Sequence, residues 1–165
     1  MKRFYKDFDI EIDVPKGFYL INPKKYSELN LKSIDQMNLI DAFVLKMEDK
    51  IANLISFYEC EDFEFDKVNF DISIQKINDN YASQINNEDI IMVKQCFDCD
   101  FNQKKGLVVI LSQKDNTETS IMQLYFEYKE KAYCFSMYYQ GLPDSFEEIE
   151  KSSIFAIMKG IIDEI

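Results

Sequence analysis

Apolar and polar residues alternate in the stretch FDIEIDV at residues 8–14, where four apolar side chains are separated by three acidic ones. A period of two predicts a strand that is buried on one face only. Pro15 and Gly17 end this pattern, because both residues interrupt regular strands. The next stretch, FYLIN at 18–22, predicts a short second strand that ends before Pro23.

Two further apolar runs, DAFVLKM at 41–47 and IANLISFYE at 51–59, are joined by the polar residues EDK and predict a hairpin. An acidic loop at 59–66 follows. Beyond it, apolar residues recur at helical spacing, at Phe70, Ile74, Ile77, Tyr81 and Ile85. This spacing predicts an amphipathic helix over about 67–86, with Asp66 as its N-cap.

Four strands are predicted in quick succession from residue 89, in the stretches DIIMVKQCFDCDF, LVVILSQ, SIMQLYFEYK and AYCFSMYYQ. The connections NQKKG, KDNTET and KEK are short, and short connections between consecutive strands favour an antiparallel meander. Ser145 and Glu148 have the spacing of a capping box, which predicts a C-terminal helix that runs to about Ile162. Its broad apolar face predicts that the helix lies against the sheet.

The order of these elements indicates an α+β fold, because strands and helices are segregated along the chain. We expect an antiparallel β-sheet of five to seven strands, with the middle helix at 67–86 and the C-terminal helix packed on it. The 165 residues correspond to a single domain, residues 1–165, since no linker or repeat divides them.

The chain is acidic, with a formal net charge of −11 and a pI near 4.5. Such a surface repels nucleic-acid phosphates and anionic membranes, so neither is an expected partner. No apolar run is long enough for a membrane span, and the N-terminus has no signal-peptide pattern. If Met1 is the native start, these features predict a cytoplasmic protein without membrane insertion. The Asn-, Ile-, Lys- and Phe-rich composition is typical of AT-rich bacterial genomes.

Two of the four cysteines form a C-x-x-C in QCFDCDF at residues 95–101. A zinc site needs four converging ligands, but Cys60 and Cys134 stand alone and the chain has no histidine. On a strand, Cys96 and Cys99 point to opposite faces, so they cannot act as a pair. We therefore expect four reduced thiols, no bound metal and no cofactor.

Familiar catalytic patterns are missing from the sequence. The lack of histidine removes Ser-His-Asp and Cys-His catalysis, and the chain has no glycine-rich phosphate loop. The acidic cluster at 59–66 is more typical of a solvated loop than of a cation site. These observations favour a protein that is not an enzyme.

The last two strands of the meander present two different faces. One alternating set is apolar and predicts the core; its members are Met122, Leu124, Phe126, Phe135 and Met137. The opposite set contains Gln123, Tyr125, Cys134 and Tyr138 and carries no charge. Tyrosine is enriched at interfaces, so these four residues are the candidate binding surface. The alternative is that they form a half-buried second layer under the N-terminal strands.

The whole chain resembles the PsbP-like/DcrB-like group of domains. The stretches that carry the resemblance are IDVPKGF at 12–18, IANLISFYE, GLVVILSQ, MQLYFEYKEKAYCFSMYYQ and FEEIEKSS. In this family, a strand that ends in a Pro-x-Gly-aromatic turn precedes a hairpin, a helix, a curved meander and a C-terminal helix. The chain departs from the family in having Phe18 where tryptophan is frequent and in lacking a lipoprotein signal. The resemblance implies a non-catalytic role, because members serve as accessory subunits, nuclear-transport cofactors or chaperones.

Three functions compete at this point. The first is a binding or adaptor domain for a protein or peptide partner, such as a chaperone or immunity-type partner of a bacterial secretion or toxin system. The second is an uncharacterised enzyme that uses acidic residues, and the third is a binder of a small apolar ligand. A cleft with converging carboxylates would favour the second. The sequence leaves the oligomeric state open.

Overall fold

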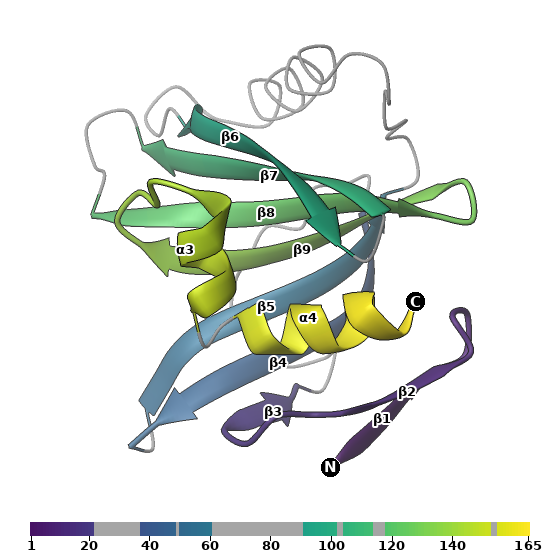
Figure 1. The fold of residues 1–165 in the computed structure, drawn as a ribbon. Helices are drawn as coiled ribbons and strands as arrows, with labels where there is room; N and C mark the ends of the chain where they lie inside the picture. Colours follow the sequence, from purple (N-terminus) through teal and green to yellow (C-terminus); the bar gives the residue numbers. More distant parts are fainter. Residues whose placement is uncertain (22–36, 49, 61–90, 102–103, 114–117, 153–154) are drawn as a thin grey trace.

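A computed structural model describes residues 1–21, 37–48, 50–60, 91–101, 104–113, 118–152 and 155–165 (Figure 1). The strands within these ranges are β1 (Lys2–Tyr5), β2 (Ile10–Asp13), β3 (Phe18–Leu20), β4 (Met37–Met47), β5 (Lys50–Cys60), β6 (Ile91–Phe101), β7 (Lys104–Gln113), β8 (Thr119–Tyr128) and β9 (Lys131–Gln140). Two helices, α3 (Phe146–Lys151) and α4 (Phe155–Glu164), follow the last strand.

Seven of the described strands form one antiparallel sheet with the order β3-β4-β5-β9-β8-β7-β6. This arrangement confirms the predicted antiparallel sheet, the 41–59 hairpin and the four-stranded meander. Strands β1 and β2 form a separate two-stranded hairpin, and the sequence pattern did not predict β1. The helix expected at 67–86 lies outside the described residues.

The C-terminal helix differs from its prediction as one continuous element. The capping residue is correct, since the Ser145 side chain accepts a hydrogen bond from the Glu148 amide. However, α3 ends at Ser152, whose backbone is extended, and α4 begins at Phe155. Serine competes for backbone hydrogen bonds and so favours helix ends over helix interiors. The break lets two short helices follow the sheet separately.

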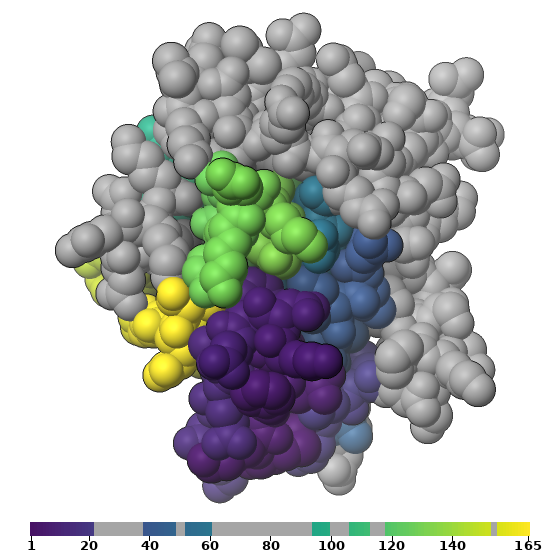
Figure 2. Space-filling model, turned by 90° about the vertical axis from the view of Figure 1, so that its right-hand side faces the viewer, coloured from purple at the N-terminus to yellow at the C-terminus, as the bar shows by residue number. Residues whose placement is uncertain are grey.

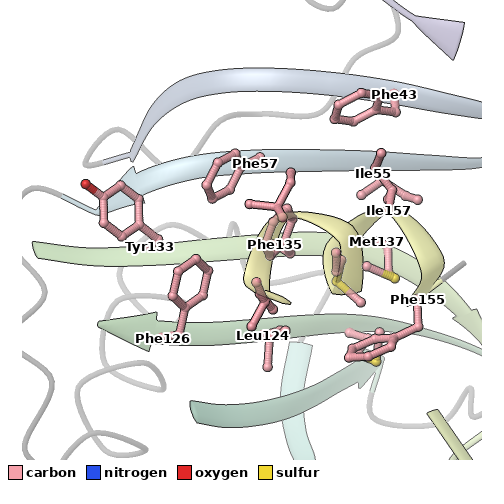
Figure 3. Packing of buried hydrophobic residues seen from close by; sticks show 14 of the residues in the cluster. Phe43, Ile55, Phe57, Leu124, Phe126, Tyr133, Phe135, Met137, Phe155 and Ile157 are labelled. Carbon is pink, nitrogen blue, oxygen red and sulfur yellow. The ribbon is translucent and has the colours of Figure 1, made fainter. Parts of the chain in front are cut away.

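The main core lies between the sheet, the two helices and the N-terminal hairpin, on what we call the helix face of the sheet (Figure 3). The meander residues predicted for the core all lie here, at 0–2% exposure. At its centre, the Phe57 ring stacks on Phe135 with centroids 4.3 Å apart and an interplanar angle of 10°. Phe8 also stacks on Phe57, at 5.8 Å. The aromatic rings thus join the hairpin to the sheet.

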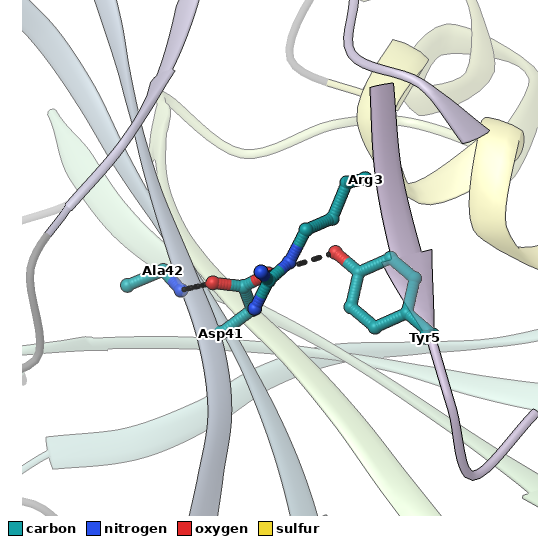
Figure 4. Close-up of polar contacts among 4 residues, drawn as sticks. All are labelled: Arg3, Tyr5, Asp41 and Ala42. Atoms are coloured by element: carbon teal, nitrogen blue, oxygen red, sulfur yellow. Dashed lines mark hydrogen bonds and ion pairs between the residues drawn. The ribbon is translucent and has the colours of Figure 1, made fainter. Parts of the chain in front are cut away.

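A buried polar contact fixes the N-terminal hairpin beside this core (Figure 4). Asp41 on β4 is only 7% exposed, and its Oδ2 accepts hydrogen bonds from Arg3 Nε at 2.8 Å and from the Tyr5 hydroxyl at 3.1 Å. Its Oδ1 accepts from the Ala42 amide at 3.1 Å. Burial and the adjacent Asp41 carboxylate raise the pKa of Tyr5, so its hydroxyl remains a donor.

The N-terminal β1–β2 hairpin, in purple, lies beside the tip of the β8–β9 hairpin, in green, and the C-terminal residues, in yellow (Figure 2). The contact between Phe8 and Tyr128, with ring centroids 5.5 Å apart, is part of this packing. The N-terminal hairpin, the β8–β9 hairpin and the C-terminal residues therefore meet on this side of the molecule.

Candidate functional site

The four residues of the predicted binding surface do share one face of the sheet. In the β8–β9 register, Tyr125 lies opposite Cys134, and Tyr138 lies two residues beyond Ser136, which faces Gln123. The shared face is correct, but most of it is closed. Gln123 and Tyr125 are 2% exposed and Cys134 is 0% exposed, whereas Tyr138 is 39% exposed. Of the four, only Tyr138 offers surface to a partner.

Two of the three buried residues, Tyr125 and Cys134, belong to a second apolar cluster on the face opposite the helices. Its members are Cys60, Leu107, Val109, Leu111, Tyr125, Ala132 and Cys134. This agrees with the alternative of a buried second layer, although the N-terminal strands do not form it: the β1–β2 hairpin lies on the helix face, and β3 is part of the sheet itself. The sequence did contain a signal for burial of this face, in the stretch LVVIL on β7, because a continuous apolar run is typical of a strand buried on both faces.

Hydrogen bonds within this layer account for its polar groups. The Tyr125 hydroxyl donates to Gln123 Oε1 at 2.7 Å, and the Cys134 thiol donates to the Phe135 carbonyl at 3.5 Å. Burial, followed by the neighbouring Cys60, raises the pKa of the Cys134 thiol. Since the thiolate is the reactive form, Cys134 is suited to packing and not to nucleophilic chemistry.

The C-x-x-C motif is an ordinary pair of strand residues. Cys99 packs in the core on the helix face, and Cys96 packs against the cluster on the opposite face. This confirms the prediction that the two thiols point apart. Within the described residues, no three His, Cys, Asp or Glu side chains converge as a metal site. Of the acidic loop, Glu59 is described, and its carboxylate pairs with Lys131 at 2.6 Å; residues 61–66 lie outside the described ranges.

Tyr138 lines an open cleft of about 640 Å³, which we call the Tyr138 cleft. The cleft lies where the free end of the β4–β5 hairpin meets the open end of the β8–β9 hairpin. Its lining residues are Leu45, Met47, Ala52, Asn53, Glu118, Thr119, Tyr138, Tyr139, Gln140 and Ser152. Met47 is 64% exposed and adds a second large apolar side chain at this site. The lining is therefore mixed, with apolar side chains beside amide and hydroxyl groups.

The cleft exists because β5 and β9 separate. Their pairing runs from Cys60 opposite Ala132 to Ile55 opposite Met137 and stops there. Beyond that point, Asn53 Nδ2 donates to the Tyr138 carbonyl at 2.6 Å, and the Tyr138 amide donates to Asn53 Oδ1 at 3.2 Å. A side-chain amide has one acceptor and two donors, so it can replace a main-chain partner. We call this junction the Asn53 bridge; it holds the two strands at the point where they diverge.

A second contact fixes Tyr139 beside the cleft. Its hydroxyl donates to Glu148 Oε1 at 2.9 Å, and Glu148 Oε2 accepts from the Asp144 amide at 2.9 Å. The Asp144 N–H, and then the Tyr139 hydroxyl, lower the pKa of Glu148. Burial, with a further contribution from Glu148, raises the pKa of Tyr139 to about 12. The contact ties the first turn of α3 to the end of β9.

This contact predicts a pH-dependent stability. Because the folded-state pKa of Glu148 is lowered, its stabilising effect is complete at neutral pH and is lost as the pH falls through that pKa. We expect Glu148→Gln to lower the Tm at neutral pH, and the difference from wild type to shrink as the pH falls below the ordinary carboxyl pKa, about 4.3, and on through the lowered folded-state pKa. Thermal unfolding followed across this range measures the difference.

Glu147→Gln is the matched control, because Glu147 lies in the same turn, is exposed and contacts Lys151 through a surface ion pair. Its Tm should remain within the error of the wild-type value at neutral pH. A Tm difference between Glu148→Gln and wild type that is constant from neutral pH to pH 3 would contradict the expected linkage.

No protein-family model and no curated protein matches this sequence. Among solved structures, the chain is similar to the solution structure of cyanobacterial PsbP (CyanoP) from Synechocystis sp. PCC 6803, with a TM-score of 0.50 and 13% sequence identity over 99% of this chain and 86% of that chain. It also matches a protein of unknown function, PA94, from Pseudomonas aeruginosa, with a TM-score of 0.43 and 9% identity over 96% and 94% of the two chains.

The similarity to CyanoP confirms a PsbP-like fold. At 13% identity it concerns the fold alone, and the DcrB-like part of the resemblance stays a prediction. Neither helix in the described part of the chain has the length and apolar character required to cross a bilayer.

Proposed function

We propose that the protein is a non-catalytic binding domain and that the Tyr138 cleft is its binding site. The observation that carries this proposal is the combination of an open cleft with partly exposed apolar side chains, Tyr138 and Met47, beside a base held by the two hydrogen bonds of the Asn53 bridge. Large side chains on a fixed frame bind at low entropic cost, because little has to be ordered on association.

The composition of the cleft bears on the two competing functions. Among the lining residues that the structure describes, Glu118 is the one carboxylate, and none is lysine, arginine or cysteine. One carboxylate does not make the pair of carboxylic acids that many hydrolases use. A small apolar ligand is also less well matched, since such ligands favour mainly hydrophobic pockets, whereas half of this lining is polar.

Within the class of binding domains, the PsbP-like fold and the DcrB-like resemblance support an adaptor role. The partner we propose is a protein or peptide, as for a chaperone or an immunity-type partner in a bacterial secretion or toxin system. The acidic chain, with its net charge of −11, favours basic partners over nucleic acids or anionic membranes.

Substitution of Tyr138 tests the proposal directly. We expect Tyr138→Ala to weaken partner binding by about 1–3 kcal/mol, which is about 5- to 150-fold, because a central aromatic side chain contributes most of its energy through desolvation. The effect on the Tm should be small, since the side chain is 39% exposed. Quantitative pull-down from lysate identifies partners, and titration of the purified partner then measures affinity.

Phe4→Ala is the matched control, because Phe4 is an exposed aromatic residue, 54% accessible, on the separate β1–β2 hairpin. It should bind partners as the wild-type protein does. The proposal fails if Tyr138→Ala and Phe4→Ala capture every partner equally well.

A further inference from the structure

We infer that the Tyr138 cleft receives an extended, positively charged peptide segment, which pairs with the exposed end of β9 as an added strand. This inference rests on the proposed function and specifies the chemistry of the ligand. It follows from the main-chain groups at the split between β5 and β9, from the shape of the cleft and from its charge.

The end of β9 pairs on one side only. Tyr138, Tyr139 and Gln140 have partners on β8, but the described pairing of β9 with β5 stops at Met137. Both main-chain groups of Tyr138 point toward the β5 side, because they bond to the Asn53 side chain. In a strand, alternate residues direct their N–H and C=O to the same side. The N–H and C=O of Gln140 therefore point into the cleft.

The neighbouring residues support this alternation. The Gly141 amide donates to the Glu118 carbonyl, on the β8 side, at 2.8 Å. Gly141 and Gln140 therefore face opposite sides, as successive strand residues do. Main-chain donors and acceptors at such a strand edge are the groups that peptides use in strand addition.

The opposite wall of the cleft is also irregular. Leu45 faces Asn53, but the next residue, Lys46, faces Ile51, so Ala52 is an extra residue in β5. This is a β-bulge, which bends its strand and redirects the local main chain. Ala52 is exposed and lines the cleft. The bulge thus turns the β4–β5 hairpin away from β9 and keeps the edge of β9 accessible.

Size and charge indicate the kind of segment that fits. The cleft volume of about 640 Å³ lies within the range of pockets for small molecules and cofactors, about 300–1,000 Å³, so only a short part of a peptide would fit in it. Glu118 is the one charged side chain in the described part of the lining, and the whole chain carries −11. A basic peptide would be attracted to this site, whereas a second copy of the chain would be repelled by its like charge.

The test uses the full-length protein and a phage-displayed library of short linear peptides. We expect selected peptides to be enriched in lysine and arginine and to lose binding to Tyr138→Ala. A synthetic selected peptide then carries N-methyl groups at one position at a time. If it binds as a strand, methylation should weaken it about five- to tenfold at alternate positions only, because alternate N–H groups face β9.

Two substitutions of Gln140 form the protein half of the test. Gln140→Pro removes the N–H that points into the cleft and leaves the bonds to β8 in place. Gln140→Ala removes the side chain but keeps that N–H. We expect Gln140→Pro to weaken the selected peptide about five- to tenfold and Gln140→Ala to change its affinity less than about twofold. The N-methyl series gives an independent answer if Gln140→Pro folds poorly.

The outcomes separate this inference from the proposed function. Binding that depends on Tyr138 but shows no alternation on N-methylation and no loss in Gln140→Pro overturns strand addition and leaves a binding cleft. Selection of acidic peptides, or binding of a second copy of the chain instead, overturns the assigned ligand. If Tyr138→Ala binds natural partners and selected peptides as tightly as the wild-type protein does, both the inference and the proposed function fail.

Discussion

Replacing Phe57 by alanine is expected to lower the free energy of unfolding by about 3–5 kcal/mol, the usual cost of removing a fully buried phenylalanine. Phe57 has 0% exposure, and its ring contacts both the sheet and the N-terminal hairpin, through Phe135 at 4.3 Å and Phe8 at 5.8 Å. Tyr5 meets the same ring edge-on at 6.1 Å. Its removal leaves a cavity that neighbouring strands cannot close without breaking their pairing.

Urea unfolding followed by fluorescence and circular dichroism measures this loss. A loss of about 3–5 kcal/mol is a large part of the stability of a small domain, so Phe57→Ala can fail to fold. Phe57→Leu serves as a milder variant, with an expected cost of about 1.5–2 kcal/mol at most. Phe4→Ala, an exposed position, should change the value by less than about 0.5 kcal/mol. Equal stability for Phe57→Ala and Phe4→Ala would show that the aromatic cluster is not the centre of the core.

Replacing Asp41 by alanine should cost about 2–3 kcal/mol, because the substitution removes the charged acceptor of the Ala42 amide and of two side-chain donors. These are the Arg3 guanidinium and the Tyr5 hydroxyl, which bond to the same carboxylate oxygen. The Arg3 side chain is 40% exposed and can regain water, so the cost lies below that of a fully buried pair. Tyr5 is 4% exposed and has less access to water.

The expected loss is localised, and hydrogen exchange can detect this. In Asp41→Ala, amides of β1 and β2 should exchange faster, while those of β7 and β8 should change little. Arg3→Ala is the matched control: it removes one exposed partner and should cost about 1 kcal/mol or less. A uniform increase in exchange across the sheet, or no destabilisation at all, would contradict the role of Asp41 as the anchor of the hairpin.

Much of the fold was predictable because its strands have clear periods. The alternation around Ile10 and Ile12 gave β2, and the short polar connections gave the meander. The first strand, KRFY at 2–5, was not predicted, because its four residues do not alternate between polar and apolar side chains. The division of the C-terminal helix occurs at Ser152, and the broad apolar face of the predicted helix gave no sign of it.

The candidate site shows a different limit. Alternation correctly assigned Tyr125, Cys134 and Tyr138 to one face of the sheet, but it does not show whether that face is exposed to solvent. Whether a side chain is exposed depends on what packs against the sheet, and this is a long-range property. The cleft itself depends on where β5 leaves β9, and thus on pairing between segments distant in the chain. Only Tyr138, at the very end of that face, was both predicted and found open.

The Asn53 bridge also has a consequence for the order of assembly. It joins residues 85 positions apart, whereas the β4–β5, β6–β7, β7–β8 and β8–β9 pairs each join strands that are consecutive in the chain. Closing a long loop costs more entropy than closing a hairpin, and distant contacts slow folding. We therefore expect the hairpins to form before β5 pairs with β9 and before the Asn53 bridge closes, so that the cleft takes shape only after its two walls exist.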